Sequence, residues 1–300
     1  MGSILLTGGT GFVGSHLLND LLENGKEVIL LKRLQSSMHR IDHLKSQFNS
    51  YDVETTDLKT IFKENKVKQI IHLATDYGRD NNFYRCNQSN VQFPLNLLQT
   101  GYDFGVSRFI STDTFSSLAK KLDYLPEYHL TKRHFREWGE LLSSFYRKEF
   151  TTVYLQHPYG PNDSEKKFTS FILASILNEV PSIDLTAGLQ KRDFIHVKDV
   201  SKAYLAILNA QTVPSVLEVG TGSSHSIREF VQEVKEQANN TTTKLNFGKL
   251  NTRANEIMDS KANLCSISQL NWRPSVEFKE GIKDLILWYQ YKLETKKKMA

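Results

Sequence analysis

The stretch ILLTGGTGFVGSHLL, residues 4–18, constrains the fold of this chain more than any other part of the sequence. An apolar run that predicts a buried strand leads into an amphipathic run that predicts a helix, and Gly8, Gly11 and Gly14 lie in the turn between them. Glycine permits a tight turn there and lets backbone N–H groups approach a pyrophosphate, whose negative charge the helix dipole favours. Residues 4–18 therefore predict a dinucleotide-binding strand, turn and helix.

Apolar and amphipathic runs continue to alternate after this turn. The expected strands are EVILLKR (27–33), VKQIIHLAT (67–75), RFISTDT (108–114) and TTVYLQ (151–156), and the longest expected helix is TKRHFREWGELLSSFYRKEF (131–150). Such alternation predicts a parallel sheet that is covered by helices on both faces. We therefore expect an α/β chain with a doubly wound, parallel-sheet Rossmann fold that binds ligands at the carboxyl ends of its strands.

The pattern becomes less regular after residue 160, which indicates a second part of the molecule. We expect a dinucleotide-binding Rossmann domain over residues 1–160, to which residues 190–222 partly return. A smaller α/β C-terminal lobe over residues 161–300 would bind the substrate. The length of 300 residues is sufficient for one such cooperative unit around a cleft.

Composition excludes several classes of function. The formal net charge is only +5, and part of it lies in the terminal LETKKKMA, so we expect no nucleic-acid partner. Cys86 and Cys265 have no metal-ligand spacing, and the histidines are scattered, so we expect no metal site. The sequence shows neither a bilayer-spanning apolar run nor a cleavable leader, which predicts a cytoplasmic protein that does not enter a membrane.

The end of the second expected strand bears on the choice of cofactor. An acid about 20 residues after the glycine turn normally accepts hydrogen bonds from the adenosine ribose. Lys32 and Arg33 stand there instead, and cations can pair with a 2′-phosphate through charge-assisted hydrogen bonds. This pattern favours NADP(H) over NAD, although NAD remains an alternative because the two cations could be solvated charges at a strand end.

Tyr128 and Lys132 form the strongest candidate for proton-transfer chemistry. Among the twelve tyrosines, only Tyr128 is followed four residues later by a lysine, and this spacing puts both side chains on one face of a helix. The ammonium of Lys132 is expected to lower the pKa of the Tyr128 phenol, which would then donate and accept protons near neutral pH. The hydroxyl-rich strand end STDT, residues 111–114, precedes the pair.

These motifs, with YGP (159–161), RDFIHVKDV (192–200) and EVGTG (218–222), resemble the extended short-chain dehydrogenases/reductases that act on nucleotide sugars. The resemblance covers nearly the whole chain. It implies that Tyr128 is the general acid/base and that Lys132 activates it and binds the nicotinamide ribose. It also implies that the hydroxyl of Thr112 polarises the reacting carbonyl.

The resemblance implies two sets of ligand-binding residues. Those expected to bind the cofactor are Gly8, Gly11, Phe12, Val13, Gly14, Lys32, Arg33, Asp52, Val53, Leu73, Ala74, Thr75, Asn90, Tyr128 and Lys132, with Asp52 and Val53 at the adenine. Those expected to bind the substrate are Thr114, His157, Phe168, Arg192 and Arg253, with the two arginines on the nucleotide diphosphate. For His196 we expect a buried, hydrogen-bonded structural role.

Two departures from the family pattern limit which of the family's reactions we expect. The 4,6-dehydratases of this family carry an Asp-Glu pair after the catalytic threonine, whereas here Asp113 is followed by Thr114. The elimination machinery is therefore incomplete, and Thr114 is an alternative to Thr112 for the hydroxyl role. His157, in LQHPYGP, stands near a position where relatives have an asparagine, which changes the local substrate contacts.

YGRDN (77–81), SNVQFP (89–94) and residues 166–200 look like the bacterial CDP-paratose and CDP-abequose synthases, which reduce CDP-4-keto-3,6-dideoxyglucose with NADPH for O-antigen. We therefore expect an NADPH-dependent 4-ketoreductase of a nucleoside-diphosphate 4-keto-deoxyhexose. The alternatives are an NAD-dependent nucleotide-sugar 4-epimerase or dehydratase and, more remotely, a non-catalytic NADP-binding interaction protein. The resemblance also implies a homodimer formed through the helix that carries Tyr128 and its neighbour.

Overall fold

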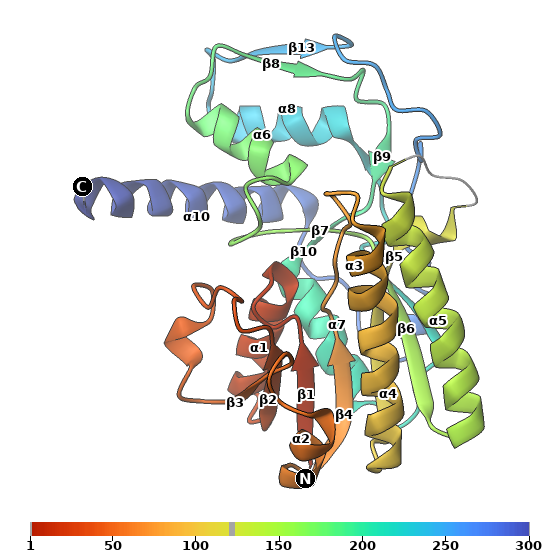
Figure 1. The fold of residues 1–300 in the computed structure, drawn as a ribbon. Coiled ribbons are helices and arrows are strands. Elements are labelled where there is room, and N and C mark those ends of the chain that lie inside the picture. The colour runs from red at the N-terminus through yellow and green to blue at the C-terminus, as the bar shows by residue number, and fades with distance from the viewer. Residues whose placement is uncertain (1, 120–123, 300) are drawn as a thin grey trace. The chain divides into compact units, whose positions relative to one another are not determined.

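The computed structural model describes residues 2–119 and 124–299 (Figure 1). The chain divides into two compact units. The first comprises residues 1–155, 201–219 and 265–272, and the second comprises residues 156–200, 220–264 and 273–300. The functional domain boundaries expected from the sequence stay a prediction.

A seven-stranded sheet in the order β11-β6-β5-β4-β1-β2-β3 forms the centre of the first unit. The strands are β1 (Ser3–Thr7), β2 (Val28–Lys32), β3 (Asn49–Asp52), β4 (Val67–His72), β5 (Arg108–Thr114), β6 (Glu149–Leu155) and β11 (Val216–Val219). Every pairing in this sheet is parallel, which confirms the doubly wound fold predicted from the sequence. The strand order reverses between β1 and β4, and ligands of such sheets bind at the carboxyl ends of the strands at this point.

Helices cover the sheet of the first unit. They are α1 (Phe12–Glu23), α2 (Leu58–Glu64), α3 (Phe83–Asn87), α4 (Phe93–Asp103), α5 (Pro126–Tyr146), α7 (Val197–Asn209, in this unit from Ser201) and α9 (Cys265–Ser268), with the short turns η1 (Asp42–Leu44), η2 (Gln88–Gln92, a π-helix) and η3 (Phe115–Leu118). Figure 1 shows α3, α4 and α5 side by side, and α5 packs against both α3 and α4.

Interlocking aromatic rings fix α5 on the sheet. Phe109 of β5 and Phe150 of β6 stack with ring centroids 5.7 Å apart, and Phe135 of α5 meets each of them edge-on at 5.9 Å. Burying one such side chain stabilises a fold by about 2 to 3 kcal/mol. Phe135 lies on the same face of α5 as Tyr128 and Lys132, so this packing also holds those two side chains against the strands.

The second unit has an apolar core of its own. Its helices are α6 (Phe168–Leu177), α8 (Ile227–Gln237) and α10 (Phe278–Met299). Three strand pairs complete it: β7 (His157–Tyr159) with β10 (Phe194–His196), β9 (Lys191–Arg192) with β12 (His225–Ser226), and β8 (Ser182–Leu185) with β13 (Lys244–Phe247). Phe194 and Phe230 stack in its core with centroids 4.7 Å apart. The predicted smaller α/β lobe is therefore present.

Within residues 2–119 and 124–299, no helix is long and apolar enough to cross a membrane. The same part of the chain holds no group of three or more His, Cys, Asp or Glu side chains that could bind a metal ion.

Candidate active site

The glycine turn after β1 lies against the end of β4. Gly8 has φ of +74°, and a Cβ atom on it would lie 2.6 Å from the backbone nitrogen of Ala74. A Cβ on Gly14 would lie 2.1 Å from the carbonyl oxygen of Gly8. Thr7 holds the two strand ends together, because its carbonyl oxygen accepts from the Leu73 nitrogen and its hydroxyl accepts from the Ala74 nitrogen, both at 3.2 Å. Only glycine fits at these two positions, as a pyrophosphate cradle requires.

Asp52, at the end of β3, offers an unused acceptor. Its Oδ1 accepts from the Glu54 nitrogen at 2.8 Å, whereas its buried Oδ2 has no hydrogen-bond partner among the described residues. A buried carboxylate oxygen without a donor is costly, and an adenine amino group is a donor of the kind that it lacks. The Val53 nitrogen donates to the Lys32 carbonyl oxygen at 2.9 Å and joins the ends of β3 and β2. Together with the glycine turn, this orphaned oxygen fits a bound dinucleotide.

Cations surround the start of this cradle. Lys32 lies opposite Asp52 in the register of β2 and β3 and is half-buried, and Arg33 is exposed. Arg40 reaches the glycine turn, because its Nη1 lies 3.5 Å from the carbonyl oxygen of Thr10. The sequence reasoning missed Arg40, because it lies in an irregular segment without motif spacing. The only sequence signal was a basic residue shortly after the strand that ends in Lys32.

Asn90 braces the loop after β4. It is 2% exposed and lies in the π-helical turn η2, a distortion that often marks functional sites. Its Oδ1 accepts from the Asp76 nitrogen at 2.8 Å and from the Thr75 hydroxyl at 3.3 Å. Its Nδ2 donates to the Asp76 carbonyl oxygen at 2.7 Å and to the Thr131 hydroxyl of α5 at 3.0 Å. Asn90 thereby joins the end of β4 to the helix that carries Tyr128, and its predicted contact with the cofactor stays a prediction.

Tyr128 and Lys132 lie on one face of α5, as predicted, and both are buried. The Lys132 ammonium lies 6.0 Å from the centroid of the Tyr128 ring and donates a hydrogen bond to the Thr112 carbonyl oxygen at 2.8 Å. Burial lowers the pKa of Lys132 to about 8, although the nearby Asp113 carboxylate acts in the opposite direction. The ammonium is therefore fixed at the end of β5.

The predicted lowering of the Tyr128 pKa by Lys132 is wrong. Burial raises the pKa of Tyr128 well above its ordinary value of about 10, and the Tyr77 phenol and the Asp113 carboxylate raise this pKa further. A hydrogen bond with the Thr114 hydroxyl acts in the opposite direction. The sequence spacing could not reveal the cost of removing a phenolate from water, which exceeds the attraction of an ammonium 6.0 Å from the ring.

The two strand-end threonines have different partners. The Thr112 hydroxyl hydrogen-bonds the hydroxyl of Tyr204 in α7, which is fully buried. The Thr114 hydroxyl hydrogen-bonds Tyr128 and lies 3.0 Å from the hydroxyl of Ser116. The structure therefore brings Tyr128, Lys132 and both threonines together, and Tyr204 and Ser116 are members of the cluster that the sequence reasoning missed.

The expected substrate cations lie in the second unit. Arg192 is 7% exposed, donates to the Ile257 carbonyl oxygen at 2.6 Å and forms an ion pair with Glu256. Burial lowers the pKa of Arg192, and the exposed Arg253 is near enough to lower it further. Arg253 therefore lies near Arg192, and the binding of a substrate diphosphate by the two arginines stays a prediction.

The other expected residues of the second unit are His157, Phe168 and His196. Burial, with the charges of Arg192 and Lys167, lowers the pKa of His157 to about 3, so its imidazole is neutral. Phe168 packs against the apolar core. His196 is 1% exposed, and its Nδ1 accepts from the Lys198 nitrogen at 3.4 Å, which confirms the expected buried, hydrogen-bonded role.

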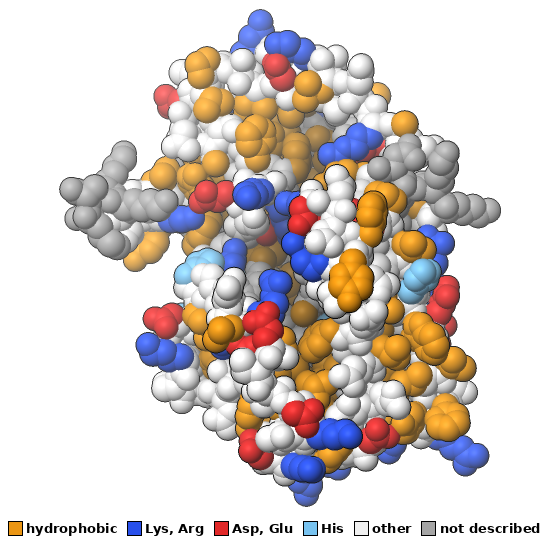
Figure 2. Space-filling view, in the orientation of Figure 1, with side chains coloured by type: hydrophobic (Ala, Val, Ile, Leu, Met, Phe, Trp, Pro, Cys, Tyr) orange, Lys and Arg blue, Asp and Glu red, His pale blue; other side chains and the backbone are white. Residues whose placement is uncertain are grey.

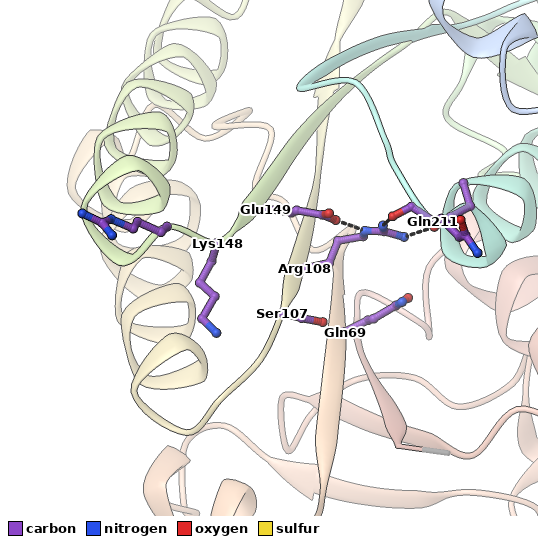
Figure 3. Close-up of a pocket in the computed structure, with 8 residues that line it drawn as sticks. Gln69, Ser107, Arg108, Lys148, Glu149 and Gln211 are labelled. Carbon is purple, nitrogen blue, oxygen red and sulfur yellow. Dashed lines mark hydrogen bonds and ion pairs between the residues drawn. The ribbon is translucent and has the colours of Figure 1, made fainter.

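A cavity of about 480 Å³ lies at the opposite end of the strands, where β4, β5 and β6 begin (Figure 3). Arg108 directs its guanidinium to the carbonyl oxygens of Ile207, Ala210 and Gln211, at 2.9, 3.0 and 3.1 Å, and pairs with Glu149. This arginine therefore satisfies the C-terminal end of α7. The cavity is a structural feature far along β5 from Thr114, and we assign no ligand to it.

Residues 4–220 match the sequence profile described as the NAD dependent epimerase/dehydratase family. The chain belongs to this family. Its members depend on a nicotinamide dinucleotide, which agrees with the glycine turn and the orphaned oxygen of Asp52.

Three curated relatives cover almost the whole chain. CDP-abequose synthases of Salmonella typhimurium and Salmonella muenchen are 32% and 35% identical to it, over 94% of this chain and 97% and 96% of theirs. A putative UDP-glucose 4-epimerase of Methanocaldococcus jannaschii is 27% identical over 95% of this chain and 97% of its own. Among solved structures, a UDP-glucose 4-epimerase of Thermotoga maritima with UDP-glucose superposes with a TM-score of 0.85 at 22% identity, over 97% of this chain and 99% of that one. That likeness confirms the fold.

Proposed function

We propose that this protein is an NADPH-dependent 4-ketoreductase of a nucleoside-diphosphate 4-keto-deoxyhexose, of the type of CDP-4-keto-3,6-dideoxyglucose, in deoxysugar and O-antigen biosynthesis. One observation carries the proposal. The Thr114 hydroxyl bonds the Tyr128 phenol at the position where the dehydratases of this family are expected to hold an elimination acid. The two CDP-abequose synthases among the relatives support this class of substrate.

In the proposed reaction the chain supplies alignment and a proton. The glycine turn, Asp52 and Lys132 would hold NADPH, which supplies a hydride to the carbonyl carbon when bound. Tyr128 gives its phenolic proton to the developing alkoxide oxygen, and the raised pKa keeps the phenol protonated through neutral pH. Tyr204 can donate its hydroxyl proton to Thr112, which leaves the Thr112 O–H free to stabilise that alkoxide. Thr114 orients the phenol.

The cations near the glycine turn support NADPH over NADH. Lys32 and Arg33 end β2, and Arg40 lies beside Thr10 in the turn itself. A 2′-phosphate on the adenosine ribose could accept charge-assisted hydrogen bonds from all three cations. We propose that Arg40 belongs to this set. We also propose that Arg192 and Arg253 bind the diphosphate of the substrate, whose negative charge would offset the repulsion between these two cations.

We further propose that the protein is a homodimer that contacts its partner through α5. Figure 2 shows hydrophobic side chains gathered over α4 and α5 at the lower right. Leu130, Trp138, Leu141 and Phe145 are 47%, 46%, 60% and 83% exposed, and their spacing puts them along one stripe of α5. A contiguous apolar stripe of this kind is typical of an interface between two copies of a chain. We also propose a cytoplasmic location, in keeping with a sequence that has only two cysteines.

An NAD-dependent nucleotide-sugar 4-epimerase is the second candidate, and the Methanocaldococcus jannaschii relative favours it. An epimerase must take and return a hydride on one cofactor within a turnover, so it retains NAD tightly. A reductase releases oxidised cofactor after every turnover. The two candidates therefore differ in what the purified protein contains and in what it consumes.

One experiment separates them. The purified protein is incubated with 4-keto deoxysugars linked to CDP, dTDP, UDP or GDP, with NADPH consumption recorded and the C4 configuration of the product assigned by NMR. We expect stoichiometric NADPH consumption and loss of turnover in Tyr128→Phe with normal cofactor binding. Stoichiometric NAD in the purified protein, with interconversion of C4 epimers and no NADPH consumption, would overturn the reductase in favour of the epimerase. Near-normal turnover of Tyr128→Phe would overturn the role of Tyr128.

A further inference from the structure

A row of hydroxyls leads away from the Tyr128 phenol to an imidazole. Tyr128 is hydrogen-bonded to the Thr114 hydroxyl, and Thr114 Oγ1 lies 3.0 Å from Ser116 Oγ. Ser116 Oγ in turn lies 3.3 Å from Nδ1 of His129. The four side chains come from the end of β5, the turn η3 and the first turns of α5. The proposed reduction uses Tyr128 and Thr114, and it gives no role to Ser116 or His129.

The partners of this row fix the direction of its hydrogen bonds. The His129 imidazole also hydrogen-bonds the backbone of Tyr124 in the sense that favours its protonation, so the ring N–H points at a carbonyl oxygen. In the neutral ring Nδ1 is then an acceptor for the Ser116 hydroxyl. The Ser116 backbone nitrogen donates to Thr114 Oγ1 at 3.4 Å, which leaves the Thr114 proton for Ser116 Oγ. Every oxygen in the row can therefore accept one proton and release another.

Part of the row is open to solvent. Thr114 and Ser116 are half-buried, and the ring of His129 at the end of the row is 7% exposed. Burial lowers the pKa of His129, the Asp113 carboxylate raises it and the Arg133 guanidinium lowers it. An imidazole with these neighbours is neutral at pH 7, and on protonation it is a much stronger acid than the Tyr128 phenol. A proton on His129 therefore moves downhill toward a Tyr128 phenolate.

We propose that Ser116 and His129 form a proton relay that returns a proton to Tyr128 after each reduction. The inference rests on the proposed reductase function, in which Tyr128 loses its proton to the substrate alkoxide. The neutral imidazole of His129 first takes a proton on Nδ1 from a buffer acid or hydronium. Thr114 then passes its hydroxyl proton to the phenolate, Ser116 passes its own to Thr114, and the His129 imidazolium passes its Nδ1 proton to Ser116, so each group ends as it began.

A purely structural explanation makes a different prediction. Thr114 caps η3 by accepting from the Ser116 nitrogen, and the cap requires only the oxygen of Thr114. Ser116→Ala would then leave turnover unchanged. Under the relay, Ser116→Ala and His129→Phe lower steady-state turnover roughly tenfold at low buffer concentration. Added imidazole restores turnover in His129→Phe, and the solvent deuterium isotope effect rises in both variants.

Matched variants exclude a folding defect. Ser116→Thr keeps the hydroxyl and should turn over like the wild type. Ser117→Ala removes a neighbouring hydroxyl that bonds the Thr114 carbonyl oxygen at 2.9 Å and lies outside the row, so it should show a normal isotope effect. A readout without turnover is ¹H–¹⁵N NMR of the His129 ring in the cofactor-free protein. We expect an unprotonated Nδ1 in the neutral ring, and a protonated Nδ1 would overturn the relay.

Failure of the relay is distinguishable from failure of the proposed function. If Tyr128→Phe turns over normally, the proposed function fails. If Tyr128→Phe is inactive in every buffer while Ser116→Ala and His129→Phe match the wild type at low buffer concentration, the relay fails and the proposed function stands. Loss of turnover in Ser116→Ala that Ser116→Thr reverses, together with rescue of His129→Phe by imidazole, supports both.

Discussion

The ring of Tyr77 packs against the ring of Tyr128, with centroids 5.0 Å apart and planes inclined by 37°. Tyr77 lies in the loop after β4, and the guanidinium of Arg79 lies 5.3 Å from the centroid of the Tyr77 ring. After burial itself, Tyr77 is the largest influence that raises the pKa of Tyr128. The loop after β4 therefore sets the acidity of the phenol that we propose as the proton donor.

Replacing Tyr77 by alanine should lower the pKa of Tyr128, because it uncovers the phenol and removes a neighbouring hydroxyl. The protonated phenol is the active form in reduction, so activity is lost as the pH rises through this pKa. We expect the alkaline limb of the kcat/KM profile to move to lower pH by about one unit. Tyr84→Ala, at a tyrosine that is 70% exposed, is the control. An alkaline limb that stays in place in Tyr77→Ala would contradict the role given to this loop.

The cations at the glycine turn should decide the cofactor. Charge-assisted hydrogen bonds contribute about 1.5 to 3 kcal/mol, so Arg40→Ala should lower kcat/KM for NADPH by about 10- to 100-fold and leave that for NADH nearly unchanged. The double variant Lys32→Ala/Arg33→Ala should act in the same direction. Lys148→Ala removes an exposed cation at the start of β6, and it should change neither value. If the ratio of kcat/KM with NADPH to kcat/KM with NADH is the same in all variants, these cations bind no 2′-phosphate.

Local pattern was sufficient to predict the scaffold of the site. Gly8 and Gly14 could be placed because a tight turn and close approach to a neighbouring strand leave room for no other residue. Tyr128 and Lys132 could be placed because a spacing of four residues puts two side chains on one helical face. Each of these predictions depends on residues close together in the sequence, where backbone geometry alone fixes the outcome.

Tertiary contacts decided the rest of the site. Tyr204 follows Thr112 by 92 residues, and nothing in either neighbourhood indicates that the two hydroxyls meet. Arg40 reaches Thr10 across an irregular segment whose path has no sequence signature. The pKa of Tyr128 was predicted in the wrong direction, because desolvation depends on everything packed around the phenol. The spacing of residues along the sequence gives no information on how deeply a side chain is buried. It also does not show which distant residues the fold brings into contact.

His157 should make the folded state sensitive to acid. The pKa of His157 is about 3 in the folded chain, and its ordinary value is 6.5. Between these two pH values the unfolded chain therefore binds a proton at His157 and the folded chain does not. The stabilisation is complete above pH 6.5 and is lost as the pH falls toward 3, at about 1.4 kcal/mol per pH unit. Between pH 7 and pH 5, we expect the free energy of unfolding of His157→Gln to fall by about 2 kcal/mol less than that of the wild type.

Urea unfolding at several pH values measures this difference. His43→Gln, at an exposed histidine of η1, is the matched control and should follow the wild type. Parallel pH dependences of the unfolding free energy in the wild type and His157→Gln would contradict the lowered pKa.

The apolar stripe of α5 gives a prediction about assembly. Leu141 and Phe145 are the most exposed of its four side chains, and a second copy of α5 would bury them. Replacing both with arginine would place unpaired charges in that interface, and a buried charge without a partner is strongly destabilising. We expect the wild type to sediment as a dimer and Leu141→Arg/Phe145→Arg to sediment as a folded monomer at the same concentration.

A control at an equally exposed leucine separates interface loss from a general effect of added charge. Leu189 is 63% exposed and belongs to the second unit, so Leu189→Arg should leave the dimer intact. The far-ultraviolet circular dichroism of all variants should match that of the wild type, because the stripe lies outside the core that Phe135 forms with the sheet. A monomeric wild type, or a double variant that stays dimeric, would show that α5 does not form the interface.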